Sequence, residues 1–319
     1  MRSTQRMVRS IVMRFLPLVA LLCMAQEPPR ITVNVHLVNV TFSVRNAAGL
    51  APSNLTKNDF EIFEDGVQQN ISFFSRSADL PLTLGLIVDA SGSQEHFVKA
   101  HHHDLQAFLK DVLQPRDRAF LVGFGNHLRL VSDFTSSSSD ILEELKRYEH
   151  DSGHFDELGP TDEDREGGTA FYDAIYYAAS EKLADGTSGR KALIIFSDGE
   201  DNSSAHHMLD AIEESQFENV PLFCIRYTEY GKHHRVTARN KYGTSVMARI
   251  AKESGGEDFD AEKKDLKDSF REIGEELRSS YELAYNSTNT ERDGYFRRIV
   301  IRSKDPAFTI RAKTGYYAR

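Results

Sequence analysis

The stretch that decides the fold is Leu82–Ser93, LTLGLIVDASGS. Its first seven residues are almost continuously apolar, which is typical of a strand buried on both faces of a parallel sheet. The apolar run ends at Asp89, and a helix-like segment follows over about Glu95–Leu113. A buried strand followed by a helix is the first half of a βα unit, so the stretch predicts an α/β fold.

The same alternation continues along the chain from this strand. Further apolar strands are predicted at 119–124, 128–134, 191–198 and 220–227, and helices at 141–148, 170–183, about 205–216, 246–253 and 264–279. Strands that alternate with helices form parallel sheets with right-handed crossovers. Residues 81–279 are therefore predicted to form an α/β domain, a doubly wound, mainly parallel sheet flanked by helices.

Both flanks of this domain have the alternating pattern of half-buried strands. In the N-terminal part, the run 31–46 alternates apolar and polar residues, and Asp65-Gly66 separates two strand-like runs as a hairpin turn. Strand patterns return at 281–287, 296–303 and 308–317. We expect the N-terminal segment 26–80 and the C-terminal segment 280–319 to pack together as a small all-β domain.

The first 25 residues have the pattern of a cleaved signal peptide. Four arginines precede a short apolar run from Phe15 to Met24, and the small residue Ala25 follows. This predicts a secreted, periplasmic or cell-surface protein with no membrane span after cleavage, because the run is too short to cross a bilayer comfortably. Lipidation of Cys23 is the alternative to cleavage, although Ala20, Leu21 and Leu22 lack the usual small residue just before the cysteine.

Cleavage would leave Cys224 as the only cysteine, so no intramolecular disulfide is expected. It would also remove four arginines and no acidic residue, which changes the formal charge from −9 to −13. Nucleic acids and anionic membranes attract clusters of Lys and Arg, so this acidity argues against both as partners.

Oxygen-bearing side chains follow two of the predicted strands and precede one helix. Asp89, Ser91 and Ser93 end the first strand, Asp198 ends the strand 191–198, and Thr169 opens a helix after two glycines. The carboxyl ends of parallel strands meet at the edge where open α/β sheets bind ligands. Carboxylates and hydroxyls suit Mg²⁺, with Mn²⁺ or Ca²⁺ as alternatives. The other interpretation of Asp89 and Asp198 is that they cap loops or helices.

Neutral hydroxyl ligands leave such an ion able to attract an external carboxylate. If Ser91, Ser93 and Thr169 bind it directly while Asp89 and Asp198 act partly through water, the ion keeps net positive charge and an open position. The expected partner is therefore a protein ligand that presents an acidic residue to the metal.

These residues resemble the metal-ion-dependent adhesion site (MIDAS) of the von Willebrand factor type A (vWA) family, in which DxSxS is followed by a distant Thr and a distant Asp. DASGS, GGTAFYDA and FSDGEDNS occur in the family's order. The flanking strand patterns resemble the bacterial subfamily called acidobacterial vWFA-related proteins. The resemblance implies a Rossmann-like vWA fold and a secreted or surface-displayed, non-enzymatic adhesion protein.

Two alternatives to an adhesion role stay open. The first is a structural vWA scaffold in an envelope assembly. The second is a metal-dependent hydrolase, against which the chain has no GxxxxGK[ST] loop, no GxSxG around Ser91 or Ser93, and no readable triad order.

Several charged segments carry weaker hypotheses. We expect the histidines 101–103 to lie on a solvated helix, since consecutive helical residues do not converge on a metal. Asp201 and Asn202 are interpreted as the capping region of the helix that follows them. The acidic segment 149–166 is expected to be an unstructured, solvated excursion. The basic segment 231–243, with Lys232, Arg235 and Arg239, is a hypothetical contact for an acidic partner.

Overall fold

A strand that is buried along its whole length, β5 (Leu82–Asp89), forms the centre of a seven-stranded sheet. It pairs in parallel with β9 (Arg190–Ser197) on one side and with β6 (Arg118–Phe124) on the other. Beyond β9, β10 (Leu222–Arg226) and β13 (Asp258–Asp260) are also parallel. Beyond β6, β7 (Leu128–Thr135) and β8 (Asp156–Glu157) are antiparallel. The predicted mainly parallel sheet is confirmed.

The computed structural model describes only part of the chain, and all of the described residues belong to one unit, Val35–Arg319. The described residues are 37–76, 80–125, 127–150, 152–159, 168–184, 189–228, 230–231, 235–236, 238–262 and 266–319. The signal peptide predicted at 1–25, with Cys23, lies outside them. Within them, no helix combines the length and apolarity needed to cross a membrane.

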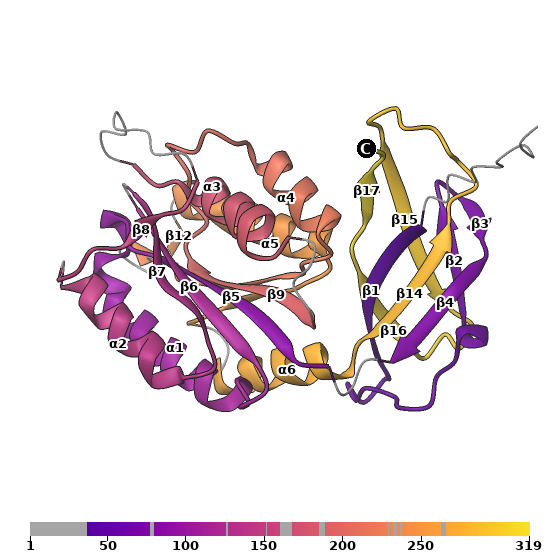
Figure 1. Ribbon diagram of the computed structural model, residues 1–319, viewed down its shortest axis with the longest axis horizontal. Coiled ribbons are helices and arrows are strands. Elements are labelled where there is room, and N and C mark those ends of the chain that lie inside the picture. Colours follow the sequence, from indigo (N-terminus) through magenta and orange to yellow (C-terminus); the bar gives the residue numbers. More distant parts are fainter. Residues whose placement is uncertain are drawn as a thin grey trace, which may run out of the picture. The chain divides into compact units, whose positions relative to one another are not determined.

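Helices cover both faces of this sheet, as a doubly wound fold requires (Figure 1). The helices of one face are α1 (Val98–Val112), α2 (Ser138–Glu149) and α6 (Leu266–Ser279). The helices of the other face are α3 (Phe171–Tyr177), α4 (Met208–Phe217) and α5 (Ala238–Ser254). Three shorter helical segments are η1 (Lys57–Asp59), η2 (Gly92–Phe97), which leads into α1, and η3 (Ala178–Lys182), which continues α3.

Two predicted loops contain regular structure. In the acidic segment 149–166, β8 pairs with β7 and Leu158 is buried, so the prediction of a solvated excursion is wrong for residues 156–158, whereas residues 152–154 are exposed. In the basic segment 231–243, β11 (Tyr230–Gly231) and β12 (Arg235–Val236) form a short hairpin. Helix α5 then begins at Ala238, eight residues before the predicted start. Lys232 and the side chains of Arg235 and Arg239 lie outside the described residues.

The terminal segments form two four-stranded antiparallel sheets, which confirms the predicted association of the N- and C-terminal strands. One sheet has the order β16-β1-β14-β4 and the other β17-β15-β2-β3. The strands are β1 (Leu37–Arg45), β2 (Phe60–Glu64), β3 (Val67–Gln69), β4 (Ile71–Arg76), β14 (Tyr281–Asn286), β15 (Phe296–Ser303), β16 (Thr309–Ala312) and β17 (Gly315–Tyr317). One apolar core includes Phe42 and Tyr281 from the first sheet and Ile62 and Ile299 from the second.

The local sequence predicts the turn between β2 and β3 correctly, but it does not predict how the segment 308–317 is divided. Asp65 and Gly66 have φ of 46° and 83°, the positive values that the tight β2–β3 hairpin requires, so the predicted turn is confirmed. The run 308–317 reads as one strand, but it divides into β16 and β17, which belong to different sheets. The alternation of apolar and polar residues in this run does not show where β16 ends and β17 begins.

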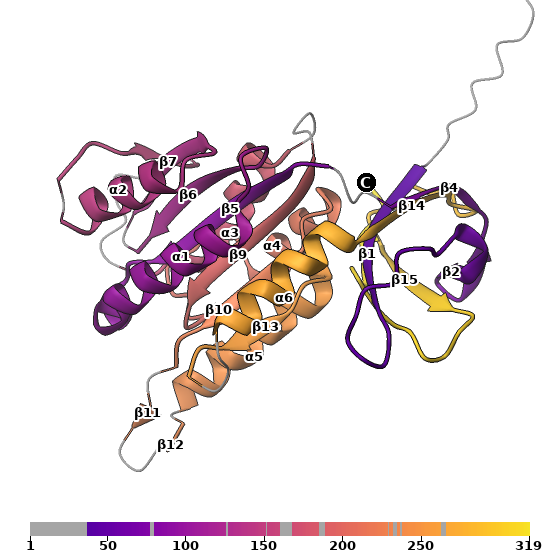
Figure 2. The ribbon, with the colours of Figure 1, turned by 90° about the horizontal axis from the view of Figure 1, so that it is seen from below.

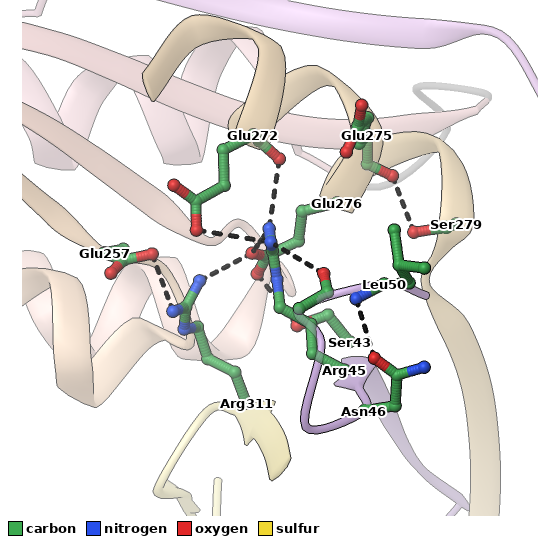
Figure 3. A network of polar contacts seen from close by, with 11 residues as sticks. Ser43, Arg45, Asn46, Leu50, Glu257, Glu272, Glu275, Glu276, Ser279 and Arg311 are labelled. Carbon is green, nitrogen blue, oxygen red and sulfur yellow. Dashed lines mark hydrogen bonds and ion pairs between the residues drawn. The ribbon is translucent and has the colours of Figure 1, made fainter. Parts of the chain in front are cut away.

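Helix α6 runs almost directly into β14 (Figure 2) and is also tied to β1 by ion pairs. The buried Glu276 accepts a hydrogen bond from the Ser43 hydroxyl at 2.9 Å. It also pairs with Arg45 at 3.1 Å and with Arg311 at 2.6 Å (Figure 3). Because three donors converge on one carboxylate, Glu276 is the centre of this contact.

We expect Glu276→Ala to destabilise the protein by about 2–3 kcal/mol, because it leaves two partly buried arginines without their shared partner. The free energy of unfolding from urea titration measures this loss. Glu275→Ala is the matched control, since Glu275 is the neighbouring residue on α6 and is exposed. Equal stability of the two variants would contradict a structural role for the Glu276 contacts.

Candidate metal centre

The register of two central strands brings Asp89 and Asp198 to one edge of the sheet. Val88 of β5 pairs with Phe196 of β9 in a parallel ladder, so Asp89 emerges beside the end of β9. The Ser197 hydroxyl donates to Asp89 Oδ2 at 2.6 Å, and the Ser91 backbone N–H donates to Oδ1 at 2.9 Å. The chain therefore folds back over the carboxylate directly after the strand ends.

The Asp89 carboxyl is 1% exposed, and its environment disfavours a bare negative charge. Burial is the main cause that raises its pKa, to about 7, and the nearby Asp198 charge adds to this effect. Hydrogen bonds from Ser197 and Ser91 oppose the shift but do not cancel it. At neutral pH this carboxyl therefore gains from a compensating positive charge, either a proton or a cation.

Asp198 is held in place by a residue that the sequence analysis missed. The Gln94 side-chain amide donates to Asp198 Oδ2 at 2.8 Å, while the Glu200 backbone N–H donates to Oδ1 at 3.0 Å. Gln94 is 1% exposed, and within the described residues its Oε1 has no hydrogen-bond partner. Its position directly after DASGS was the only available signal. Gln94 is therefore best described as a residue that positions Asp198.

The backbone of Thr169 is held by hydrogen bonds to the loop that follows Asp198. Its backbone N–H donates to Asn202 Oδ1 at 2.6 Å, and its carbonyl accepts the Asn202 and Ser203 backbone N–H groups at 3.1 and 3.3 Å. Gly168 permits this close approach, because it has φ of 151° and a Cβ there would lie 2.5 Å from the Ser203 Cβ. The two loops thus form one hydrogen-bonded assembly at the sheet edge.

Asp201 acts as a capping residue, but for a different helix from the predicted one, and Asn202 caps no described helix, since its side chain binds the Thr169 backbone instead. Asp201 Oδ1 accepts the backbone N–H groups of Phe171 and Tyr172, at 2.9 and 3.3 Å, at the start of α3. The following helix, α4, is instead capped by His207 and Asp210. Because the two loops contact each other in the folded chain, Asp201 caps α3 instead of α4. The spacing of residues along the sequence does not show this contact.

The structure places four of the five predicted metal ligands in described, buried positions. Asp89, Ser91, Thr169 and Asp198 are at most 8% exposed. Ser93 lies in η2, but its side chain is outside the described residues. Within the described part, no three His, Cys, Asp or Glu residues cluster as metal ligands, so a metal here depends on hydroxyls as well as two carboxylates. This oxygen-only set fits a hard divalent cation.

The three consecutive histidines on α1 do not share one environment. His102 lies 3.4 Å from Glu149, and His103 is exposed. His101 is 1% exposed and packs against Tyr227, with 4.3 Å between the ring centroids. The prediction of a solvated helix is therefore wrong for His101, because this position faces the sheet.

Comparison with known proteins supports the vWA family, which the fold and the candidate metal site at the sheet edge also suggest. Residues 84–200 match the sequence model of the von Willebrand factor type A domain, so this region of the chain is a vWA domain. Domains of this class generally mediate protein interactions. None of the curated proteins compared with the chain matches it significantly.

Several solved structures are similar at low sequence identity. One is an aerotolerance-related membrane protein from Bacteroides fragilis, with 15% identity, a TM-score of 0.46, and coverage of 61% of this chain and 98% of that one. Another is the hypothetical protein BatB from Bacteroides thetaiotaomicron, with 15% identity, a TM-score of 0.45, and coverage of 62% and 100%. A von Willebrand factor type A protein from Catenulispora acidiphila has 13% identity, a TM-score of 0.45, and coverage of 89% and 74%.

The raised pKa of Asp89 predicts how the stability of the metal-free protein changes with pH. Because the folded-state pKa of about 7 exceeds the ordinary value of 3.8, the folded protein holds a proton that the unfolded chain has released between these values. Stability from this group is therefore complete below pH 3.8 and is lost as the pH rises through 7. Relative to wild type, Asp89→Asn should gain up to about 4 kcal/mol between pH 4 and 8.

Urea unfolding of the metal-free proteins at several pH values measures this gain. Asp111→Asn is the control, because Asp111 is an exposed aspartate on α1. A difference in unfolding free energy between wild type and Asp89→Asn that stays constant across this pH range would show that the pKa of Asp89 is not raised.

Proposed function

We propose that the chain is an exported, non-enzymatic adhesion module that captures a carboxylate of a protein partner through Mg²⁺ at a complete MIDAS. The proposed ligands are Asp89, Ser91, Ser93, Thr169 and Asp198, and Mn²⁺ or Ca²⁺ is expected to substitute. One observation carries this proposal. Asp89 is buried beside Asp198 at the carboxyl edge of the sheet, where its pKa is raised to about 7.

The roles of the residues follow from their charges and supports. Asp89 and Asp198 supply the negative charge that retains a cation, and Gln94 and Ser197 orient these carboxylates. Ser91, Ser93 and Thr169 contribute neutral oxygens, so they do not cancel the remaining positive charge. When bound, the cation supplies a Lewis-acidic position that attracts an acidic side chain.

Export and subfamily are part of the same proposal. The N-terminal signal pattern supports a secreted, periplasmic or cell-surface location, where an adhesion module meets its partners. The flanking strands support membership of the acidobacterial vWFA-related subfamily, because the first and last segments together form the two β-sheets beside the vWA domain.

Calorimetric titration of the EDTA-stripped protein with Mg²⁺ and Mn²⁺ tests the site. We expect saturable binding by wild type and a loss of at least about tenfold in affinity, about 1.4 kcal/mol, in Asp89→Ala and Thr169→Ala. Asp111→Ala is the control for removing a carboxylate elsewhere in the domain, and it should bind as wild type does.

A second measurement tests capture of a carboxylate. N-acetyl-aspartate amide should displace water from protein-bound Mn²⁺ and lower its effect on the relaxation of solvent protons. The matched asparagine compound should not do so. Metal binding that is equal in wild type and Asp89→Ala would overturn the proposed MIDAS and leave the vWA domain as a structural scaffold.

A further inference from the structure

A cavity of about 220 Å³ lies at the edge of the large sheet that is opposite the candidate metal centre. Arg190, which begins β9, and Pro221, which precedes β10, line it, so it lies at the amino ends of the parallel strands. Asn39 and Thr41 of β1 also line it. We call it the amino-edge pocket. None of its described lining residues is a proposed metal ligand.

Lys313 is a buried cation in the wall of this pocket. The residue is 6% exposed, and its ammonium group donates to the Gln216 carbonyl at 2.8 Å and to Asn219 Oδ1 at 2.6 Å. Both acceptors are neutral. Gly255 allows the chain to pass this closely, because its φ is 92° and a Cβ there would lie 2.6 Å from the Lys313 backbone nitrogen. The position of Lys313 is therefore fixed by its hydrogen bonds and by close backbone packing.

The carboxylates on the neighbouring elements are paired with other cations. Glu253, at the end of α5, pairs with Arg249 at 2.7 Å. Glu257, which follows α5, pairs with Arg311 at 2.6 Å. Burial lowers the pKa of Lys313 to about 7, and among the described residues no nearby charge contributes to this shift. Within the described chain, Lys313 is therefore a buried cation without a carboxylate partner.

The other charged groups that line the pocket balance one another. They are the cations Arg190, Lys191 and Arg311 and the acids Glu218, Glu276 and Glu282. Lys191 pairs with Glu218 at 3.2 Å. Arg311 pairs with Glu276 at 2.6 Å (Figure 3). Burial lowers the pKa of Arg190 to about 10, and the charge of Glu282, its neighbour, opposes this shift. Lys313 is therefore the one positive charge left over among the described residues that line the pocket.

Apolar side chains form much of the remaining wall. Phe42, Phe223 and Leu277 are buried. Leu80 and Phe217 are 44% and 49% exposed, so they form an apolar entrance. Large apolar side chains that stay exposed beside a cavity are typical of ligand sites, because a ligand removes them from water. The pocket thus combines one surplus positive charge with an apolar entrance.

We propose that the amino-edge pocket binds a small organic monoanion, a carboxylate with a short apolar chain. The carboxylate neutralises Lys313, and the chain covers Leu80 and Phe217. A monoanion matches the single surplus charge, whereas a dianion such as phosphate leaves a negative charge buried without a partner, which is costly. A cavity of this volume admits a chain of a few carbon atoms. This binding is independent of the proposed metal function, because the two sites share no described residue.

The test is a calorimetric titration of the protein at pH 6 with hexanoate and with hexanamide, its neutral counterpart of nearly the same shape. We expect hexanoate to bind wild type at least about tenfold more tightly than hexanamide. The same titration at pH 9 should show a smaller preference, because Lys313, with its pKa of about 7, has then largely lost its proton. Among the described lining residues none is a histidine.

Lys313→Met removes the charge and keeps a chain of similar length, so it should bind hexanoate and hexanamide equally. Lys110→Met is the matched control, because Lys110 is an exposed lysine on α1, and it should keep the wild-type preference. Leu80→Ser changes an exposed residue of the entrance and should weaken hexanoate binding by at least about threefold. Acetate, which lacks the chain, should bind this variant and wild type equally.

The wild-type comparison at the two pH values tests the charge of Lys313 even if Lys313→Met does not fold. Three results rule out the proposed site. They are equal or undetectable binding of hexanoate and hexanamide by wild type at pH 6, a preference that is unchanged at pH 9, and a preference that persists in a folded Lys313→Met protein.

Discussion

The burial of one carboxylate at the end of the central strand is the constraint on which the functional edge depends. Asp89 follows seven residues that are enclosed by sheet neighbours and helices on both faces, so its side chain cannot reach bulk water. The parallel register with β9 then places Ser197 against it and Asp198 nearby. A folded chain that buries two carboxylates in this way accepts either a raised pKa or a bound cation.

The loop after β9 and the start of α3, which lie at this edge of the sheet, are held together by hydrogen bonds. Asn202 anchors the backbone of Thr169, Asp201 caps α3, and Asp173 accepts the backbone N–H groups of Ala205 and His206 at 3.0 Å. These contacts join the loop after β9 to the start of α3. Pre-organisation of this kind lets neutral hydroxyl ligands keep a fixed position without a tight charge interaction.

The terminal strands and the vWA domain also meet through a small number of strong contacts. Glu276 connects α6 to Arg45 and Arg311, and Lys313 donates to the Gln216 carbonyl at 2.8 Å near the C-terminal end of α4. Burial lowers the pKa of the Lys313 ammonium group to about 7. The first and last segments of the described chain are therefore structurally coupled to the domain between them.

The amino-acid sequence by itself determined the class of the fold, the pairing of the terminal β segments and the five candidate ligands, because hydrophobic periodicity and strand-end residues are local signals. It did not determine the burial of His101, the cap that Asp201 gives to α3, the support of Asp198 by Gln94, or the division of 308–317 between two sheets. Each of these features joins residues that are distant in the chain or that face a neighbour. Only tertiary packing decides such contacts, because a residue's burial and partners depend on what the rest of the chain places against it.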